Sequence, residues 1–194
     1  MRDEALRRRL LDMAADDQRL RAELHERGEL SEGYNPRMEA LHISNAHELE
    51  AALAMGWPGR SRVGEDGAAA AWLIAQHAIS LPAFQRRCLA LLAKAVEGDE
   101  APVRQLAYLT DRIRMFEGRP QIYGTQFDWD DQGQMSPVLI EDAAKVDDRR
   151  SEAGLPPLAQ TIAEHRASAG PAPASLAERR SAYEAWLRKV GWRT

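Results

Sequence analysis

The chain has 194 residues, a formal net charge of −4 and a single cysteine, Cys88. The length fits one domain with a core of its own, and a single cysteine excludes an intramolecular disulfide. Basic residues are interspersed with acidic ones, so no phosphate-binding stripe exists and we expect no nucleic-acid partner. No segment approaches the roughly 18 apolar residues of a membrane helix, and none resembles a signal peptide. We expect a cytoplasmic protein with no membrane partner.

The apolar residues of segment 3–27 recur at helical spacing and predict an amphipathic helix: Leu6, Leu10, Met13, Leu20 and Leu24. Asp17 occupies the middle of this stripe, where the period asks for an apolar side chain. Two explanations are open. Asp17 forms an ion pair with an arginine of a neighbouring helix, or it is a buried carboxylate at a functional site, with a pKa set by its surroundings.

A second helix is expected over residues 37–54, with His42 and Asn45 on the same side as its apolar residues. A lone histidine on an apolar face is more often a core residue than a ligand, and this is the expectation for His42. An amide that faces inward, as expected for Asn45, needs several hydrogen-bond partners.

Residues 64–79 carry small or apolar side chains on almost every side, which is typical of a helix buried at the centre of its domain. A turn-rich segment that contains Trp57 leads into this helix. Gln76 and His77 lie near its end, about 100° apart around the axis, and each needs a partner if it is buried. We therefore expect this helix to form both the core and the floor of a polar pocket.

Further helices are expected over residues 80–98, where Ser80 would be the N-cap, over 102–116, and from 141 to 167 in two parts. In the helix 102–116, Asp111 belongs to a mixed stripe with Arg104, Tyr108 and Met115. This stripe predicts either ion pairs along the helix surface or a contribution of Asp111 to the pocket.

Aromatic and β-branched residues at about 121–140 predict one small β-hairpin, with Gln121, Tyr123 and Thr125 on one face of its first strand. Gly124 indicates a bulge or a close backbone approach. A linker rich in proline and alanine follows at 169–174, and a capping box at Ser175 begins a C-terminal helix in 175–194. This helix would pack on the body or on a partner, for example in a homodimer.

The predicted fold is therefore mainly α: one helical domain over residues 1–168, with six to eight helices around residues 68–79 and one hairpin. Its polar residues on otherwise apolar elements predict a pocket for a small-molecule ligand. His77 is the expected catalytic acid or base, with Asp17 or Asp111 fixing its tautomer. A second set is expected to bind the substrate: Asn45, Trp57, Gln76, Arg112, Gln121, Tyr123 and Gln126.

The predicted function is that of a small-molecule enzyme with hydrolytic or transfer chemistry. The alternative is a non-catalytic ligand-binding or protein-interaction domain, in which the same polar residues form a structural network. We expect no metal ion and no cofactor. His42 and His47 are five residues apart, which fits neither a helical zinc pair nor a zinc finger. No spacing requires a site shared by His77, Asp17 and Asp111.

Four stretches of the chain resemble a bacterial family of uncharacterised proteins: GWP at 56–58, AWLIAQH at 71–77, AYLTDR at 107–112 and QIYGTQ at 121–126. The resemblance covers about residues 10–165. It implies a single domain, and it implies no reaction.

Overall fold

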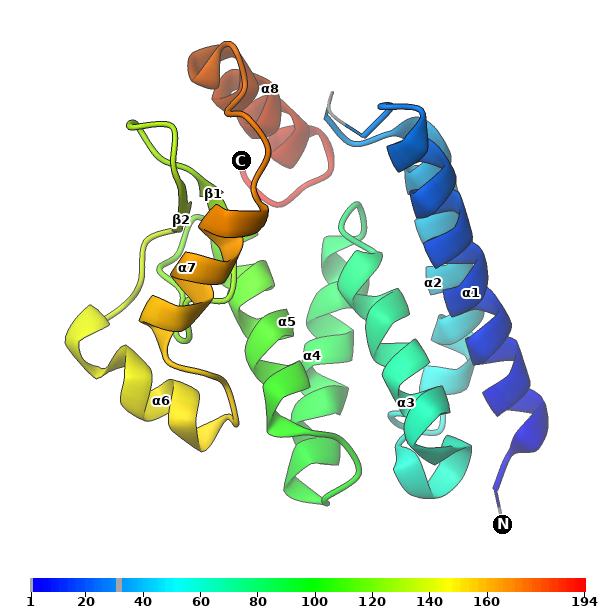
Figure 1. The fold of residues 1–194 in the computed structure, drawn as a ribbon. Coiled ribbons are helices and arrows are strands. Elements are labelled where there is room, and N and C mark those ends of the chain that lie inside the picture. Colours follow the sequence, from blue (N-terminus) through cyan, green and yellow to red (C-terminus); the bar gives the residue numbers. More distant parts are fainter. Residues whose placement is uncertain (1, 31–32) are drawn as a thin grey trace. The chain divides into compact units, whose positions relative to one another are not determined.

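The computed structural model describes residues 2–30 and 33–194, and the chain divides into two compact units, Met1–Pro102 and Val103–Thr194 (Figure 1). The boundary falls inside the segment 1–168 that the sequence suggested as one domain. The first unit contains α1 (Glu4–Glu26), α2 (Pro36–Leu53), α3 (Arg60–His77) and α4 (Pro82–Glu97). The second contains α5 (Val103–Phe116), β1 (Phe127–Trp129), β2 (Met135–Pro137), a 3-10 turn at Ala143–Lys145, α6 (Val146–Glu152), α7 (Leu158–Ser168) and α8 (Leu176–Lys189).

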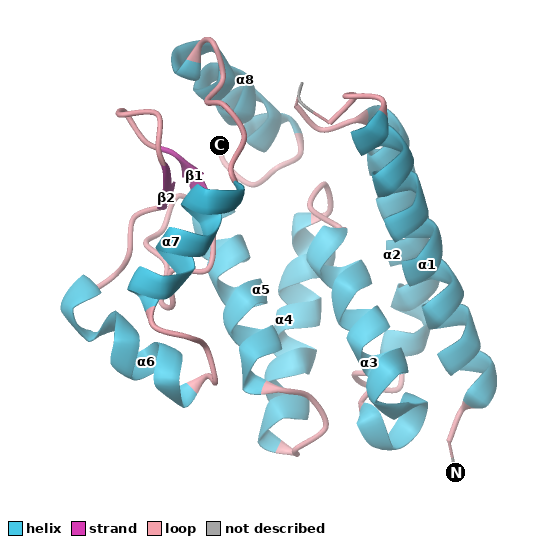
Figure 2. Cartoon of the chain, viewed as in Figure 1, coloured by secondary structure: helices cyan, strands magenta, loops and turns pink. Residues whose placement is uncertain are grey.

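The prediction of a mainly α fold with one small hairpin is confirmed (Figure 2). None of the described helices is both long enough and apolar enough to cross a bilayer.

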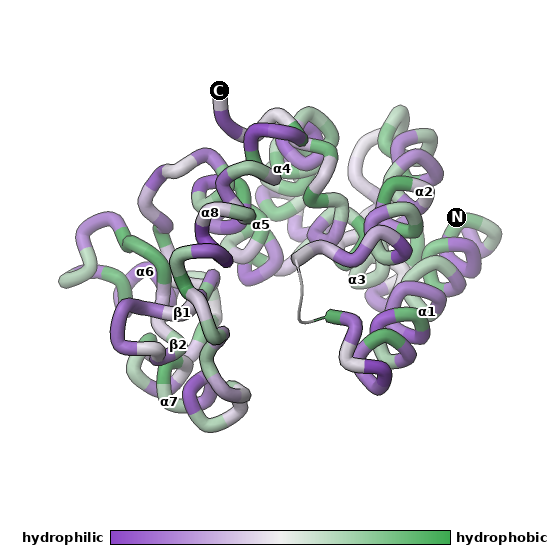
Figure 3. Tube along the Cα trace, turned by 90° about the horizontal axis from the view of Figure 1, so that it is seen from above, coloured by the Kyte–Doolittle hydropathy of each residue, from purple (hydrophilic) through white to green (hydrophobic). Residues whose placement is uncertain are grey.

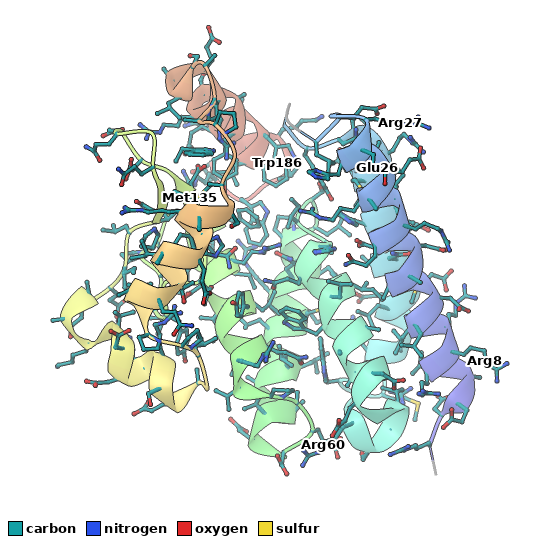
Figure 4. All side chains as sticks on the ribbon, in the orientation of Figure 1. Arg8, Glu26, Arg27, Arg60, Met135 and Trp186 are labelled. Atoms are coloured by element: carbon teal, nitrogen blue, oxygen red, sulfur yellow. The ribbon has the colours of Figure 1, made fainter. Side chains whose placement is uncertain are left out.

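In the first unit, α1, α2 and α3 pack against one another, and α4 contacts α2 and α3. Hydrophobic and hydrophilic stretches alternate along α1 in Figure 3, as expected for a helix with one buried face. Leu10, Met13 and Leu24 lie on the buried face, while Arg8 extends away from the helix on the exposed one (Figure 4). Asp17 is buried among these apolar residues. The amphipathic pattern therefore predicted α1 well, including the unusual position of its aspartate.

The central helix α3 begins at Arg60, earlier than the sequence suggested, and is kinked at Gly64, whose φ of 75° and ψ of 167° are not helical. After the kink, the Asp66 carboxylate accepts a hydrogen bond from the backbone N–H of Gly67 and two from the Arg7 guanidinium of α1. Downstream, Ala71, Ile74 and Ala75 are fully or almost fully buried. This segment is the expected centre of the unit.

The C-terminal end of α3 is closed by side chains from other elements. The Gln85 amide of α4 donates to the carbonyls of Ala75 and Gln76, which lie in the last turn of α3. The N-cap position of α4 belongs to Leu81, so the prediction of Ser80 as the cap is wrong. The Ser80 hydroxyl instead donates to the carboxylate of Glu39 on α2.

In the second unit, β1 and β2 pair antiparallel, with Phe127 opposite Pro137 and Trp129 opposite Met135. The hairpin is shorter than predicted, because residues 121–126 form a loop and only Gln121 makes a bridge, with Ile140. Gly124 has a φ of 65°, and a Cβ there would lie 2.7 Å from a side-chain carbon of Ile140. The close approach expected at this glycine is therefore present.

The C-terminal helix packs on α5 within the second unit. The ring of Phe116 at the end of α5 meets the rings of Trp186 (labelled in Figure 4) and Trp192 at centroid distances of 5.8 and 5.1 Å. The Arg193 guanidinium donates to the carbonyls of Met115 and Phe116, which lie at the C-terminal end of α5. These contacts tie the C-terminal segment to the end of α5.

The backbone at Gly64 generates a first prediction. Replacing Gly64 with alanine should destabilise the chain by about 1–3 kcal/mol, because only glycine adopts this conformation without strain. A Cβ would also lie 3.1 Å from an oxygen of Asp66. Urea denaturation measures the effect. Gly98→Ala is the matched control, because Gly98 has a negative φ and its added Cβ would meet nothing closer than 3.5 Å. Equal losses in the two variants would contradict the assignment of strain to Gly64.

Candidate functional site

Three titratable side chains from three helices converge inside the first unit. The Asp17 carboxylate, only 1% exposed, lies with its Oδ2 2.8 Å from Nδ1 of His77 and 3.0 Å from Nε2 of His42. The two imidazole rings are 5.0 Å apart between centroids. One carboxylate oxygen is therefore shared by two imidazoles, and we call this group the Asp17 cluster.

The position of each member follows from its helix. Asp17 lies on the buried stripe of α1, His42 on the buried face of α2 near its start, and His77 is the last residue of α3. Because α1, α2 and α3 pack against one another, side chains on their facing stripes at similar height meet. Asn45, one turn beyond His42, ties the same two helices by donating its amide to the Met13 carbonyl of α1 at 3.4 Å.

Tyr34, which precedes α2, joins His42 to the end of α3. Its hydroxyl lies 2.5 Å from Nδ1 of His42 and 3.5 Å from the carbonyl oxygen of His77, and its ring stacks on that of His42. A hydroxyl can both accept and donate a hydrogen bond. Tyr34 can therefore accept a hydrogen bond from Nδ1–H of His42 and donate one to the carbonyl of His77. The sequence analysis did not single out Tyr34.

The two histidines determine the charge state of Asp17. Burial by itself would raise the pKa of Asp17, but the hydrogen-bonding and charge interactions with His42 and His77 outweigh burial and hold the pKa well below its usual range. Asp17 is therefore ionised at neutral pH. The arginine partner considered for Asp17 is not found among the described residues, because its partners are two histidines. The carboxylate is buried and its pKa is set by these partners, as in the second explanation, while its place at a functional site stays a prediction.

Two polar atoms of the cluster have no hydrogen-bond partner among the described residues: Oδ1 of Asp17 and Nε2 of His42. Nε2 of His42 is nevertheless within ion-pair distance of Asp17, 3.0 Å from its Oδ2. Buried atoms of this kind are uncommon in folded proteins and call for an explanation. His77 differs from the other two members because its side chain is 20% exposed, which connects the cluster to solvent.

The structure assigns different surroundings to the other predicted residues of the first unit. Gln76 is buried at the end of α3, next to His77 in the chain. Trp57 is buried beyond the end of α2, and Leu53, which ends that helix, is about 16 Å along its axis from His42. Burial raises the pKa of the Cys88 thiol to about 12, consistent with the expected core role of this residue.

Asp111 belongs to the second unit, where its carboxylate organises the loop 121–126. It accepts hydrogen bonds from the backbone N–H groups of Ile122, Tyr123 and Thr125 and from the Thr125 hydroxyl, at 2.7 to 3.2 Å. Asp111 itself is fully buried. These donors satisfy both of its oxygens and replace the strand pairing that the sequence suggested for 121–126. The prediction of a strand with Gln121, Tyr123 and Thr125 on one face is therefore wrong.

The remaining predicted substrate ligands join the same loop. The Gln121 side chain bonds to the backbone of Gln126 and Val138, and the Gln126 side chain bonds to Thr125 and to Nε of Arg112. Burial, followed by the charge of Asp111, raises the pKa of the Tyr123 hydroxyl. Every one of these contacts is internal to the second unit.

Arg150 is a structural residue that the sequence analysis missed. It is 2% exposed, and its guanidinium donates to the carbonyls of Tyr123, Gly124 and Pro156 and to the Thr161 hydroxyl. In the sequence, Arg150 is the second arginine of a pair that shortly precedes Gly154, and its charge gives no reason to expect burial.

The low pKa of Asp17 leads to a second prediction. A depressed folded-state pKa gives stability that is present above the unfolded pKa of about 3.9 and is lost as the pH falls through the lower folded value. Asp17→Asn should therefore be less stable than the parent at pH 7 by about 3 kcal/mol, the scale of a broken buried pair. Urea denaturation should show the gap closing as the pH falls below about 4. A gap that is constant over this range would contradict the assignment.

The bonding of Asp111 leads to a third prediction. Asp111→Ala should destabilise the chain by about 3 kcal/mol or more, because it leaves several buried N–H groups without an acceptor. Asp148→Ala, which removes an exposed carboxylate in α6, is the control and should change the free energy of unfolding by less than about 0.5 kcal/mol. Similar values for the two variants, measured by chemical denaturation, would refute the structural role of Asp111.

Comparison with known proteins places the chain in a family without assigning it a reaction. No curated protein and no solved structure matches it. The model of a family of unknown function, DUF6624, matches residues 4–170. The matched segment includes all three members of the Asp17 cluster and ends before α8. The chain therefore belongs to the family of unknown function DUF6624.

Proposed function

We propose that the chain is an enzyme that acts on a small molecule by acid–base chemistry of the hydrolytic or transfer type, with the Asp17 cluster as its reactive group. The observation that carries the proposal is the ionised Asp17 carboxylate, 1% exposed and shared between two imidazoles.

The cluster is an unfavourable solution for stability alone. An ionised carboxylate loses its hydration on burial, and hydrophobic residues of similar volume often stabilise a fold as well as a buried ion pair does or better. The other buried positions on this stripe of α1 hold apolar side chains (Leu10, Met13 and Leu24), so an apolar residue could also have filled the position of Asp17. Titratable groups held together in this way are concentrated at functional sites.

The geometry gives His77 a defined tautomer. Because Asp17 is ionised, its Oδ2 accepts the hydrogen bond at 2.8 Å, and the neutral ring of His77 carries its proton on Nδ1. Nε2 then holds the lone pair and can act as a base, while the carboxylate stabilises the imidazolium that results. A positioned general base of this kind contributes roughly 10²- to 10⁴-fold to a rate.

Two further polar side chains lie close in sequence to the histidines of the cluster. Glu39 and Ser80 are bonded to each other and lie three residues from His42 and His77, one helical turn along α2 and just after α3. Both are half-buried. A cytoplasmic location, the absence of a nucleic-acid partner and a homodimer remain predictions from the sequence.

The second candidate function is a non-catalytic ligand-binding or interaction domain. One observation favours it: Asp111 and the side chains of Gln121 and Gln126 are engaged in hydrogen bonds within the second unit. The acid–base proposal therefore depends on the Asp17 cluster and not on Asp111.

The test uses His77→Ala in the full chain, assayed with chromogenic esters, amides and phosphate monoesters. We expect the parent to turn over one of these classes and the variant to lose about 10²- to 10⁴-fold in kcat/KM. Added free imidazole should restore part of the rate, which a purely structural defect would not allow. The melting temperature should fall by only a few degrees.

The control for this test is His47→Ala, which removes an exposed histidine from α2. It should retain full activity. An unfolded His77→Ala protein, or one that is folded and fully active, would overturn the acid–base assignment and favour the non-catalytic alternative.

A further inference from the structure

We propose that the Asp17 cluster is a binding site for one divalent transition-metal ion, with Asp17, His42 and His77 as its protein ligands. Sequence spacing predicted no metal site, because its ligands come from three different helices. Ion binding goes beyond the acid–base proposal and does not require that the chain be an enzyme.

The distances within the cluster match those between ligands of one ion. The ligand atoms offered by the three residues all lie within 4.8 Å of one another, and Oδ2 of Asp17 is 2.8 and 3.0 Å from the two imidazole nitrogens. Neighbouring ligands at 90° with bonds of roughly 2.0–2.2 Å are separated by about 2.8–3.1 Å, and tetrahedral ligands by about 3.3–3.6 Å. The two separations from Oδ2 of Asp17 agree with the 90° arrangement and are shorter than the tetrahedral one.

The two atoms without hydrogen bonds point to the same conclusion. Nε2 of His42 and Oδ1 of Asp17 are buried and have no hydrogen-bond partner among the described residues. A cation would give Nε2 a ligand bond, while Oδ1 could complete a bidentate carboxylate or accept from a water molecule on the ion. One ion would therefore account for both atoms.

Tyr34 orients His42 for this role. In a metal site, the second nitrogen of a histidine ligand usually donates to a neighbouring oxygen, which fixes the tautomer. Nδ1 of His42 lies 2.5 Å from the Tyr34 hydroxyl, which in turn reaches the His77 carbonyl. With the proton on Nδ1, Nε2 of His42 carries a lone pair and lies 3.0 Å from Oδ2 of the Asp17 carboxylate, so that two electron-rich atoms are close together. A cation between them removes this repulsion.

The surrounding charge also favours a cation. Asp17 supplies a full negative charge, and the C-terminal end of α3, where His77 lies, supplies the partial negative charge of a helix dipole. To ligate through Nδ1, the neutral His77 ring must change its tautomer, so that its single N–H proton leaves Nδ1 and is carried on Nε2.

The ligand set indicates the class of ion. Two imidazoles and one carboxylate bind Fe²⁺, Mn²⁺, Co²⁺, Ni²⁺ or Zn²⁺, and three protein ligands leave positions for water and substrate. If the proposed function also holds, a water molecule on the ion would become acidic enough to supply the base at neutral pH. That role rests on the proposed function, whereas the binding of the ion does not.

The experiment titrates the metal-free full chain with Co²⁺, Ni²⁺ and Zn²⁺ by isothermal calorimetry and measures bound metal after gel filtration. We expect one ion per chain, and visible absorption bands of imidazole-bound Co²⁺. His42→Ala and Asp17→Asn should each weaken binding by at least 100-fold. Tyr34→Phe, which keeps all three ligands, should weaken it by about 10- to 100-fold.

His47→Ala is the matched control and should bind the ion as the parent does. Parent protein that binds no ion, or an unchanged affinity in folded His42→Ala, would overturn the proposal. If the ligand variants fail to fold, an unchanged affinity in Tyr34→Phe would overturn it instead. A parent that binds one ion and turns over no substrate would refute the enzymatic proposal alone.

Discussion

The first unit depends on the contact between the ionised carboxylate of Asp17 and two imidazoles. Asp17 lies where α1 should place an apolar residue, and its charge is tolerated there because His42 and His77 approach the same oxygen from α2 and α3. The arrangement also requires the end of α3 to be held in place, which Gln85 and Tyr34 achieve by bonding to its last carbonyls. The Asp17 cluster therefore forms only when α1, α2 and α3 are packed, and its contacts in turn hold these three helices together.

The second unit also contains a buried aspartate, but its partners are neutral and do not titrate near neutral pH. Both oxygens of Asp111 accept hydrogen bonds from N–H groups of the loop 121–126 and from the Thr125 hydroxyl. Such a carboxylate fixes a loop and has little capacity left for a ligand. Asp17 shares its charge with two titratable rings and keeps one oxygen without a hydrogen bond among the described residues. This difference is the physical reason why the proposed function rests on Asp17, whereas the bonding of Asp111 is structural.

The sequence predicted the elements governed by local periodicity. The boundaries of α1 and α2, the capping of α8 by Ser175, and the inward direction of Asp17 all follow from residues within a few turns of one another. The pairing of Asp17 with His77 was also expected, as one of two options. His42 was assigned to the core, because a single histidine on an apolar stripe shows nothing of the two helices that face it.

Long-range contacts account for the errors. Aromatic and β-branched residues over 121–126 favour a strand in isolation, but the buried Asp111 carboxylate draws their N–H groups into a loop. The proposed metal ligands could not be recognised from the sequence either, because each of them lies on a different helix. Spacing rules detect sites within one element, whereas this site exists only after three helices have packed.

The most direct measurement is the protonation of the His77 ring in the metal-free full chain at neutral pH, read from long-range ¹H–¹⁵N correlation spectra. The exposed His47 serves as the internal reference. A proton held on Nδ1 of His77 and bonded to Asp17, which moves from that nitrogen when Zn²⁺ is added, is the predicted result. A His77 ring with its proton on Nε2 before zinc is added, and with spectra that zinc leaves unchanged, would contradict both the carboxylate contact and the ion site built on it.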